Sequence, residues 1–472
     1  MIFSSLEFLC VFLPITFLLY CIIPSIKLKN GLLIAASLLF YAYGEPVFVC
    51  LMIGSALFNY LMARGLAGKR RKPVLVIALI VNFAILGIFK YAMFFVDSIN
   101  ALLHLDIPCP QIDLPVGISF FTFQAVSYVV DVYRGKAEVQ KSFPKVLLYI
   151  AFFPQLIAGP IVRYTDISQA IDERSLTIEN AAFGLRRFIC GLAKKVLIAN
   201  TMGSVADAIF AAQVETVNAL GAWLGAIAYL MQIYYDFSGY SDMAIGLGKM
   251  FGFRFRENFQ YPYGASSIQD FWRRWHISLS SWFKEYVYIP LGGNRKGKFR
   301  SAMNRMCVFL LTGLWHGANW TFVLWGIYHG LFLLLEEYVP FVKKLPKWLS
   351  HVYTLVVVCV GFVLFRADTV TDGFSYIGQM FTGFFNSPEA VALVCQQLTP
   401  YFIFMLVAAV IGMAPIRFLA DRIRKKEADM ALLTGKWKWL QKGLFVMAFL
   451  LLAWCMIRLS GSTYNPFIYF RF

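Results

Sequence analysis

Histidine is the residue type in this sequence that points most directly to chemistry, because its ordinary pKa near 6.5 lets a neutral ring accept a proton at physiological pH. Of the five histidines, His316 lies in an apolar run, residues 314–322 (LWHGANWTF). A polar side chain in such a run is costly and is therefore a functional candidate. On a continuous helix Asn319 and Trp320 would share a face with His316, where they could orient its ring or stack on a ligand. The alternative is a structural histidine that a neighbouring helix satisfies.

His329 follows in the same apolar run, thirteen residues after His316. On a continuous helix that spacing leaves the two side chains roughly 220° apart. We therefore expect no pairing between the two rings, and a structural or supporting role for His329.

A second group of candidates lies in residues 266–290 (SSIQDFWRRWHISLSSWFKEYVYIP). Ser267 followed by Asp270 is typical of a capping box at a helix start. Aromatic and leucine side chains then recur at helical spacing, at Phe271, Trp275, Leu279, Trp282 and Tyr286. The pattern predicts one amphipathic helix.

This helix has two interpretations. As an interfacial helix it would only anchor the chain through its aromatic belt. As a cytoplasmic-side entrance it would present Arg273, Arg274, Trp275 and Lys284 to a phosphate-bearing donor, with His276 pointing inward.

The aromatic end of the sequence, residues 465–472 (NPFIYFRF), is also open to two interpretations. Aromatic side chains commonly anchor a chain at the membrane interface. A tyrosine hydroxyl is also a nucleophile that could carry an acyl group over a short distance, and Tyr469 is the candidate.

Other polar residues in apolar sequence are Gln155, Asp236 and Asp242, for which we expect contacts between helices. No His or carboxylate pair has metal-ligand spacing, so no metal site is predicted. The sequence has no P-loop, no GxGxxG after a strand and no GxSxG elbow. Most of the nine cysteines lie in apolar runs and are expected to be packing residues.

The elements that must position these residues are membrane helices. Of 472 residues, 59% are apolar and 15% charged, which excludes an ordinary soluble domain. The net charge of +17 lies in separate loops, which indicates topology and argues against nucleic-acid binding. The predicted membrane segments are 5–24, 31–43, 47–63, 73–97, 115–132, 144–161, 181–199, 219–238, 302–336, 349–366, 400–419 and 443–459. Segments 31–43 and 181–199 are short or charged and are candidates for interfacial or re-entrant helices, and 302–336 is one tilted helix or a broken pair.

Loop charges predict the orientation. Residues 64–72 are basic and therefore cytoplasmic, whereas 104–113 contain no Lys or Arg and are therefore external. The basic region 249–305 and the basic block 422–442 are placed inside, so the N-terminus and the tail 463–472 are predicted to be extracytoplasmic. The first apolar segment has no basic n-region or cleavage site, and we expect it to remain as a helix.

Five ordered motifs together resemble the membrane-bound O-acyltransferase family, most closely its bacterial alginate O-acetyltransferase branch. They are residues 152–161 (FFPQLIAGPI), 235–246 (YDFSGYSDMAIG), 271–280 (FWRRWHISLS), 288–295 (YIPLGGNR) and 314–322 (LWHGANWTF). The resemblance implies one all-α polytopic domain over residues 1–472, with about 11 transmembrane helices plus re-entrant or interfacial helices around a central tunnel. Residues 267–300 would form the cytoplasmic-side re-entrant segment.

The resemblance also implies a function. His316 matches the family's near-invariant histidine and His276 its second polar position. The implied reaction moves an acetyl group from cytoplasmic acetyl-CoA towards an extracytoplasmic polysaccharide, in a bacterial cytoplasmic membrane. His316 would be the general base, Asn319 or His276 the oxyanion donor, and Tyr469 a possible relay. A secreted or periplasmic acyltransferase is the expected partner, and no cofactor is expected beyond the acyl donor. The alternatives are D-alanyl transfer, transfer of a longer acyl chain, or a transporter or flippase.

Overall fold

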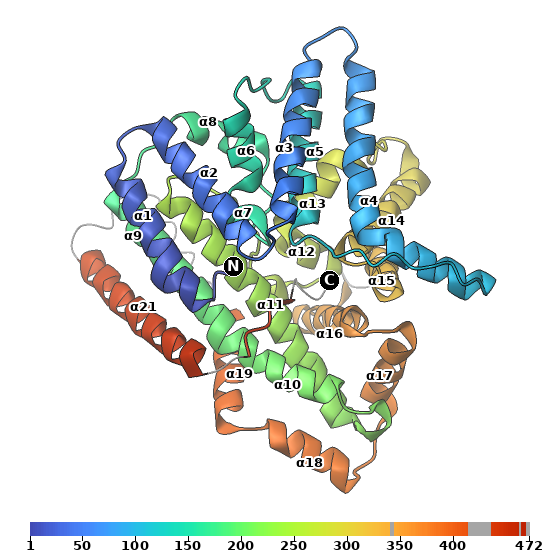
Figure 1. Ribbon diagram of the computed structural model, residues 1–472. Coiled ribbons are helices and arrows are strands. Elements are labelled where there is room, and N and C mark those ends of the chain that lie inside the picture. Colours follow the sequence, from blue (N-terminus) through green and yellow to red (C-terminus); the bar gives the residue numbers. More distant parts are fainter. Residues whose placement is uncertain (340–343, 414–435, 462–463, 469–472) are drawn as a thin grey trace. The chain divides into compact units, whose positions relative to one another are not determined.

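The computed structural model describes residues 1–339, 344–413, 436–461 and 464–468, with side chains from 439 onward in the third range. Within these ranges the regular structure is helical, and none of it is β-strand. The chain divides into two units, residues 1–188 with 241–257 and residues 189–240 with 258–472. Figure 1 shows the helices of both units.

The first unit is built on aromatic packing. Its helices are η1 (Phe8–Phe12, π-helical), α1 (Leu13–Ile22), α2 (Ile26–Ala42), α3 (Phe48–Gly65), α4 (Arg71–Leu103), α5 (Ile118–Tyr133), α6 (Phe143–Ala151), α7 (Phe153–Leu156), α8 (Tyr164–Asp172) and most of α9 (Ile178–Ala193). Phe8, Phe40 and Phe153 are fully buried, and their rings meet at 5.6–6.3 Å between centroids. This aromatic cluster joins the start of the chain to α2 and α7. Figure 1 shows α3 and α4 as antiparallel neighbours.

The second unit holds the predicted site residues. Its helical elements are η2 (Lys194–Ala199, π-helical), α10 (Asn200–Phe210), η3 (Val214–Thr216), α11 (Ala219–Met250, whose residues from 241 belong to the first unit), η4 (Pro262–Gly264), α12 (Ile268–Arg274), α13 (Ile277–Phe283), η5 (Lys284–Tyr288, π-helical), α14 (Gly297–His316), α15 (Trp320–Tyr338), α16 (Lys347–Arg366), α17 (Val370–Thr382), α18 (Pro388–Gln397), α19 (Pro400–Met413) and α21 (Lys436–Gly461).

Several of these helices could cross a membrane. Among the described residues, five helical segments are long and apolar enough, namely Phe48–Gly65, Arg71–Leu103, Ile178–Phe210, Lys347–Arg366 and Trp439–Gly461. The bent pair α18 and α19, which meet at 66°, would make a sixth. The predicted total of about eleven spans stays a prediction. The basic block 422–442 lies mostly outside the described residues.

Two predicted segments differ in the structure. Segment 144–161 is not one helix, because α6 ends before Phe152 and α7 contains Pro154, which has no N–H to continue the helical hydrogen bonds. Segment 181–199 is not short, because α9, η2 and α10 run on as one apolar stretch, Ile178–Phe210. The charges that made 181–199 a candidate for an interfacial or re-entrant helix include Arg187, which is paired with Asp242 at 2.7 Å in the first unit.

The helices α14 and α15 meet through glycine. A Cβ added at Gly313 would overlap the carbonyl oxygen of Phe322, and one at Gly326 would overlap that of Phe309. The two backbones therefore touch, as small residues allow in membrane helix pairs. This contact fixes the end of α14, where His316 lies.

Candidate active site

His316 is the last residue of α14, and the chain turns sharply after it. Gly317 is extended, with φ −165° and ψ 157°, and a Cβ there would overlap the Phe322 ring. Asn319 then starts α15, where its Oδ1 accepts a hydrogen bond from the Thr321 N–H at 3.1 Å. Only glycine fits at position 317, because the Phe322 ring occupies the space of a side chain. Asn319 is needed there because its side chain caps the start of α15.

The prediction that Asn319 and Trp320 share a helical face with His316 is wrong, because residues 302–336 form the broken pair α14 and α15. The Nδ2 of Asn319 donates to the carbonyl of Asp368 at 2.9 Å. Trp320 is 54% exposed and does not line the cavity at His316.

The His316 ring lies among aromatic side chains. Its centroid is 5.1 Å from that of Phe365, 5.2 Å from that of Trp325 and 6.5 Å from that of His276. A cavity of about 20 Å³ opens beside the ring, room for roughly one water molecule. Its lining is apolar apart from His316 and the two indoles, and consists of Ile233, Phe237, Trp275, His316, Trp325, Phe362, Phe365 and Ile468.

His276 lies at a break in the predicted amphipathic helix, and its ring is close to that of His316. Ser267 caps α12 by accepting from the Asp270 N–H at 3.0 Å, as the sequence predicts. The single helix does not continue, however, because His276 adopts a left-handed conformation at φ 44° between α12 and α13. Such a backbone is uncommon for a non-glycine residue and marks a position held by its surroundings.

The start of α12 is held from another helix. Glu336 of α15 accepts hydrogen bonds from the N–H groups of Ile268 and Gln269, at 2.7 and 3.1 Å. A carboxylate at a helix N-terminus satisfies the free N–H groups there. Glu336 thereby ties the segment that carries His276 to the helix that follows His316.

His329 lies on α15 and is fully buried. Its ring contacts Trp325 at 5.1 Å, and Trp325 also contacts His316. Within the described part of the chain, neither nitrogen of His329 has a hydrogen-bond partner. The two histidines share a tryptophan neighbour, and the geometry gives His329 a packing position.

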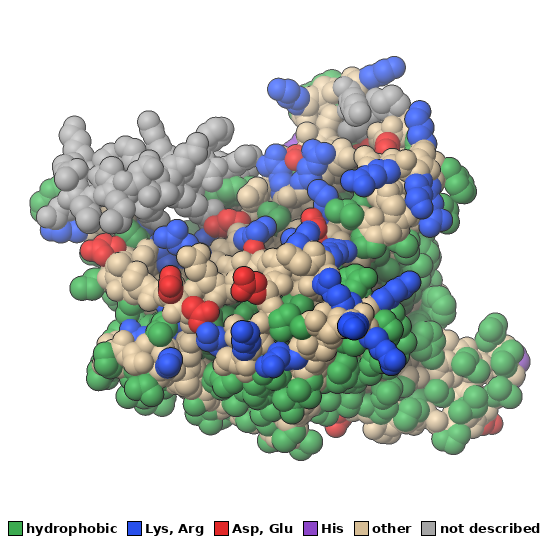
Figure 2. Space-filling view, turned by 90° about the horizontal axis from the view of Figure 1, so that it is seen from above, with side chains coloured by type: hydrophobic (Ala, Val, Ile, Leu, Met, Phe, Trp, Pro, Cys, Tyr) green, Lys and Arg blue, Asp and Glu red, His purple; other side chains and the backbone are tan. Residues whose placement is uncertain are grey.

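The donor-entrance candidates do not form one group. Arg273 and Lys284 are exposed, and Arg274 pairs with Asp270 at 2.9 Å. Trp275 is buried and lines the His316 cavity. Figure 2 shows a face of the protein on which Lys and Arg side chains are numerous.

Residues 464–468, here called the tail segment, run into the interior of the second unit. Tyr464 donates to Asp207 at 2.7 Å, and the Ile468 N–H donates to Asp236 at 2.9 Å. Lys195 pairs with Asp236 at 2.9 Å and also donates to the Pro466 carbonyl. Ile468 reaches the His316 cavity. Tyr469 lies outside the described residues.

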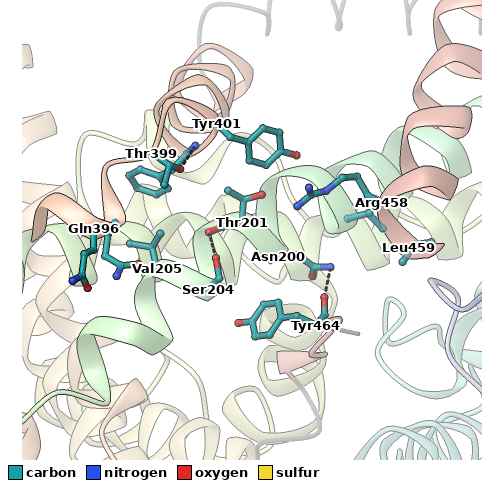
Figure 3. Close-up of a pocket in the computed structure, with 13 residues that line it drawn as sticks. Asn200, Thr201, Ser204, Val205, Gln396, Thr399, Tyr401, Arg458, Leu459 and Tyr464 are labelled. Carbon is teal, nitrogen blue, oxygen red and sulfur yellow. Dashed lines mark hydrogen bonds between the residues drawn. The ribbon is translucent and has the colours of Figure 1, made fainter. Parts of the chain in front are cut away.

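A larger pocket lies at the other end of the tail segment, with a volume of about 240 Å³. Figure 3 shows Thr201 and Ser204 of α10, Tyr401 of α19, Arg458 of α21 and Tyr464 around it. The Arg458 guanidinium lies 4.8 Å from the centre of the Tyr401 ring. The tail segment thus lines both pockets, with Tyr464 in the larger pocket and Ile468 in the small cavity beside His316.

Sequence reasoning missed two parts of this site. Asn258, which hydrogen-bonds His276, lies in a loop without a motif. Lys195 is one of the charges of the predicted segment 181–199, and the sequence does not show that it pairs with Asp236, which lies in another apolar run. No group of three or more His, Cys, Asp or Glu side chains that could hold a metal ion is found where the structure describes the chain.

Comparison with known proteins decides the class of protein. The model of the membrane-bound O-acyltransferase family matches residues 116–366, which include His276 and His316. The chain belongs to this family. It is therefore a multi-pass membrane O-acyltransferase, and this membership favours the enzymatic interpretation over the transporter.

Three individual relatives show which O-acyltransferases the chain is similar to. The chain is 41% identical to a probable alginate O-acetylase of Pseudomonas putida, over the full length of both. It is 36% identical to a peptidoglycan O-acetyltransferase of Helicobacter pylori, over 80% of each chain. It is 30% identical to a teichoic acid D-alanyltransferase of Bacillus subtilis, over 53% of this chain and 68% of the relative.

Proposed function

We propose that the protein moves an acetyl group from cytoplasmic acetyl-CoA to hydroxyls of an extracytoplasmic polysaccharide. The observation that carries the proposal is the position of His316, buried beside His276 at a small cavity that the tail segment reaches. The similarity to an alginate O-acetylase and a peptidoglycan O-acetyltransferase supports acetyl as the group and a glycan as the acceptor. The proposal includes a single domain of about eleven spans around a tunnel, in a bacterial cytoplasmic membrane with the tail outside.

His316 serves as the general base in this proposal. A nitrogen of the neutral ring takes the proton of the attacking hydroxyl, and the hydroxyl oxygen bonds to the thioester carbonyl carbon. The carbon–sulfur bond then breaks, and the imidazolium returns its proton to the departing thiolate. Asn319 or His276 would stabilise the oxyanion of the intermediate. The contact between the His276 and His316 rings supports His276 in this role. The Asn319 amide is already engaged, because it donates to the Asp368 carbonyl and accepts from the Thr321 N–H.

The cationic candidates have a different role, at the donor entrance. The exposed Arg273 and Lys284 would meet the phosphates of the CoA donor, while Arg274 pairs with Asp270 and Trp275 lines the cavity. No cofactor takes part beyond this acyl donor.

A relay through Tyr469 extends the proposal. Ile468 lines the cavity beside His316, and Tyr469 is the next residue in the sequence. The Tyr469 oxygen would take the acetyl group from CoA, and a glycan hydroxyl would then displace the tyrosine oxygen from the acetyl carbon. The second transfer goes to the glycan directly or through a secreted or periplasmic acyltransferase.

D-alanyl transfer is the second candidate function, which the similarity to the teichoic acid enzyme supports over about half of this chain. Transfer of a longer acyl chain is a further alternative, which differs from acetyl transfer in the length of the donor that the protein accepts. Competition between acetyl-CoA and longer acyl-CoA donors in the same assay measures this preference.

The test uses purified protein in liposomes with labelled acetyl-CoA, and compares the native chain with His316→Ala. Thioester cleavage by the native chain alone is the expected result. Label retained on Tyr469 would support the relay, and His316-dependent cleavage without label on the chain would contradict it. Equal cleavage by both proteins would overturn the role of His316, and no cleavage in the presence of a glycan acceptor would overturn the acetyl-CoA proposal.

A further inference from the structure

The larger pocket, beside Tyr464, is lined mainly by polar side chains that carry no charge. All of its lining residues belong to the second unit, and its volume of about 240 Å³ lies just below the roughly 300–1,000 Å³ of small-molecule sites. Besides two tyrosines, its neutral polar side chains are Asn200, Thr201, Ser204, Gln396, Gln397 and Thr399. Amides and hydroxyls both donate and accept hydrogen bonds, as the hydroxyl groups of a sugar do. The pocket therefore suits a small ligand that is rich in hydroxyls.

The side chains of α10 offer hydrogen-bond acceptors to such a ligand. The Thr201 hydroxyl donates to the Leu197 carbonyl at 2.7 Å, and the Ser204 hydroxyl donates to the Thr201 carbonyl at 2.9 Å. A hydroxyl that donates its proton keeps two lone pairs, so both oxygens can accept. The Oδ1 of Asn200 is also buried, and within the described ranges it has no hydrogen-bond partner. These oxygens match ligand groups that donate, as hydroxyls do.

Arg458 gives the pocket a positive charge. It is the one charged side chain among the lining residues that the structure describes, and it lies exposed in the last turn of α21. No carboxylate pairs with its guanidinium in the described part of the chain, whereas Arg366 pairs with Asp207 at 2.7 Å. The N–H groups of an arginine form a fork that matches the two oxygens of a carboxylate. The pocket is therefore complementary to an anion.

Tyr401 supports the guanidinium and adds a hydroxyl. Figure 3 shows the Arg458 side chain reaching from α21 towards α10, with the Tyr401 ring of α19 beside it, and the guanidinium lies 4.8 Å from the ring centre. The Tyr401 hydroxyl oxygen is buried, and no described residue hydrogen-bonds to it. Buried hydroxyls are normally hydrogen-bonded. This hydroxyl therefore leaves a hydrogen bond for a ligand.

The tail segment connects this pocket to the cavity beside His316. Tyr464 lines the pocket and Ile468 lines the cavity. Four residue steps of even a fully extended chain span at most about 14 Å. The Nδ2 of Asn200 donates to Oδ1 of Asn465 at 3.2 Å, which holds the tail segment against α10. A molecule in the pocket is thus a short distance from the proposed site of transfer.

We infer that this pocket binds a sugar residue that carries a carboxylate, with Arg458 on the carboxylate and the neutral polar side chains on the sugar hydroxyls. The inference rests on the proposed function, because it makes this sugar a residue of the acceptor glycan. The proposed orientation places the end of α21 outside, where the glycan lies. A phospholipid phosphate would also pair with Arg458, but its headgroup offers few hydroxyls to the six neutral polar side chains.

The first test measures binding by the full chain in phosphatidylcholine nanodiscs. The probes are uronate trisaccharides of the gluco, galacto and manno series, each with a counterpart whose carboxyl groups are reduced to alcohols. By isothermal titration calorimetry we expect one series to bind at least about tenfold tighter than its neutral counterpart, because a hydrogen bond to a charged group is lost on reduction. Equal affinity for acidic and neutral probes in every series, or no binding of any, would overturn the inference.

Variants assign this preference to the pocket. Arg458→Gln should abolish most of it and leave binding of the neutral probe unchanged, whereas Arg458→Lys should keep part of it. Tyr401→Phe should weaken acidic and neutral probes alike, because it removes only a hydroxyl. The matched control is Arg70→Gln, which replaces an exposed arginine of the loop 64–72 outside the pocket. An undiminished preference in Arg458→Gln, or an equal loss in Arg70→Gln, would contradict the assignment.

Mass spectrometry of the purified chain tests for a lipid in the pocket. We expect the native chain and Arg458→Gln to retain the same phospholipids. A phospholipid that copurifies with the native chain and is lost from Arg458→Gln would identify a lipid headgroup as the occupant and would overturn the inference.

Transfer kinetics separate failure of this inference from failure of the proposed function. With labelled acetyl-CoA and the trisaccharide that binds best, Arg458→Gln should raise the acceptor KM by about tenfold with little change in kcat, because Arg458 contacts the acceptor away from the reacting atoms. A native chain that binds the trisaccharide but cleaves no acetyl-CoA would contradict the proposed function and leave the binding site standing. Transfer to acidic and neutral acceptors with equal KM, unchanged in Arg458→Gln, would overturn the binding site and leave the function standing.

Discussion

Nζ of Lys195 lies 2.9 Å from Oδ1 of Asp236 inside the second unit, where the side chains are 3% and 1% exposed. The pair is completed by backbone groups of the tail segment, since Lys195 donates to Pro466 and Asp236 accepts from Ile468. Charges this deeply buried are tolerated when each is paired and hydrogen-bonded. The ion pair is therefore the anchor of the tail segment.

Removing one partner of this pair should destabilise the protein. We expect Lys195→Met or Asp236→Asn to lower the free energy of unfolding by about 3–5 kcal/mol, because the other group is left unpaired in the interior. Thermal unfolding in detergent measures the loss. The double variant Lys195→Met with Asp236→Leu should recover much of the stability but lose the bonds to the tail, which faster proteolysis of the tail would reveal.

Substitution of His316 should greatly reduce catalysis and leave the protein folded. We expect His316→Ala to lower thioester cleavage by about 10²- to 10⁴-fold, because the proton acceptor is lost. Cleavage in liposomes measures the effect, and the thermal unfolding curve shows whether the variant is folded. A fall of less than threefold in a folded variant would assign the base to another residue.

His329 provides the contrasting case. Its buried ring has no hydrogen-bond partner in the described region, which costs roughly 1–3 kcal/mol for a polar group. We expect His329→Leu to fold with equal or higher stability and to retain thioester cleavage. Loss of cleavage by a stably folded His329→Leu would show that the ring takes part in the reaction.

Alanine at the glycine contact between α14 and α15 should be severely destabilising. The added methyl of Gly313→Ala or Gly326→Ala meets the carbonyl oxygen of the facing helix, so the helices must separate. We expect a loss of more than about 2 kcal/mol by thermal unfolding. Gly378→Ala in α17 is the control, because its Cβ meets nothing within 4 Å. That substitution should be neutral or stabilise by up to about 1 kcal/mol.

The relay makes a prediction for the end of the chain. Tyr469→Phe should keep the bonds of the tail segment and lose transfer to the glycan, since only the hydroxyl is removed. Acetyl content of the polysaccharide in cells measures the outcome, with Tyr464→Phe as a control that removes the bond to Asp207 instead. Unchanged acetylation in Tyr469→Phe would make the tail an anchor only.

The sequence predicted the helical class and the neighbourhood of the two histidines, for identifiable reasons. Long apolar stretches such as 73–97 and 349–366 correspond to α4 and α16, because hydropathy alone determines such helices. The proximity of His276 and His316 came from the family resemblance. Periodicity could not supply it, because each histidine lies at a helix break.

Those breaks are tertiary effects. The apolar periodicity of 266–290 continues through His276, yet hydrogen bonds from the Asn258 loop turn the backbone there. The chain also bends after His316 because Phe322 packs against Gly317, a contact that appears only once α15 folds back. The partners of Lys195 and Asp236 were missed for the same reason, since charge pairing between distant segments leaves no periodic signal.

The contact between α14 and α15 has a consequence for how the enzyme responds to its lipids. Two helices that contact each other through long side chains can separate enough for a lipid acyl chain to enter between them. Their tilt can then change with the thickness of the bilayer. Where the backbones touch at Gly313 and Gly326, no lipid chain fits between them. The position of His316 should accordingly be insensitive to lipid chain length, and activity in thin and thick bilayers should differ little.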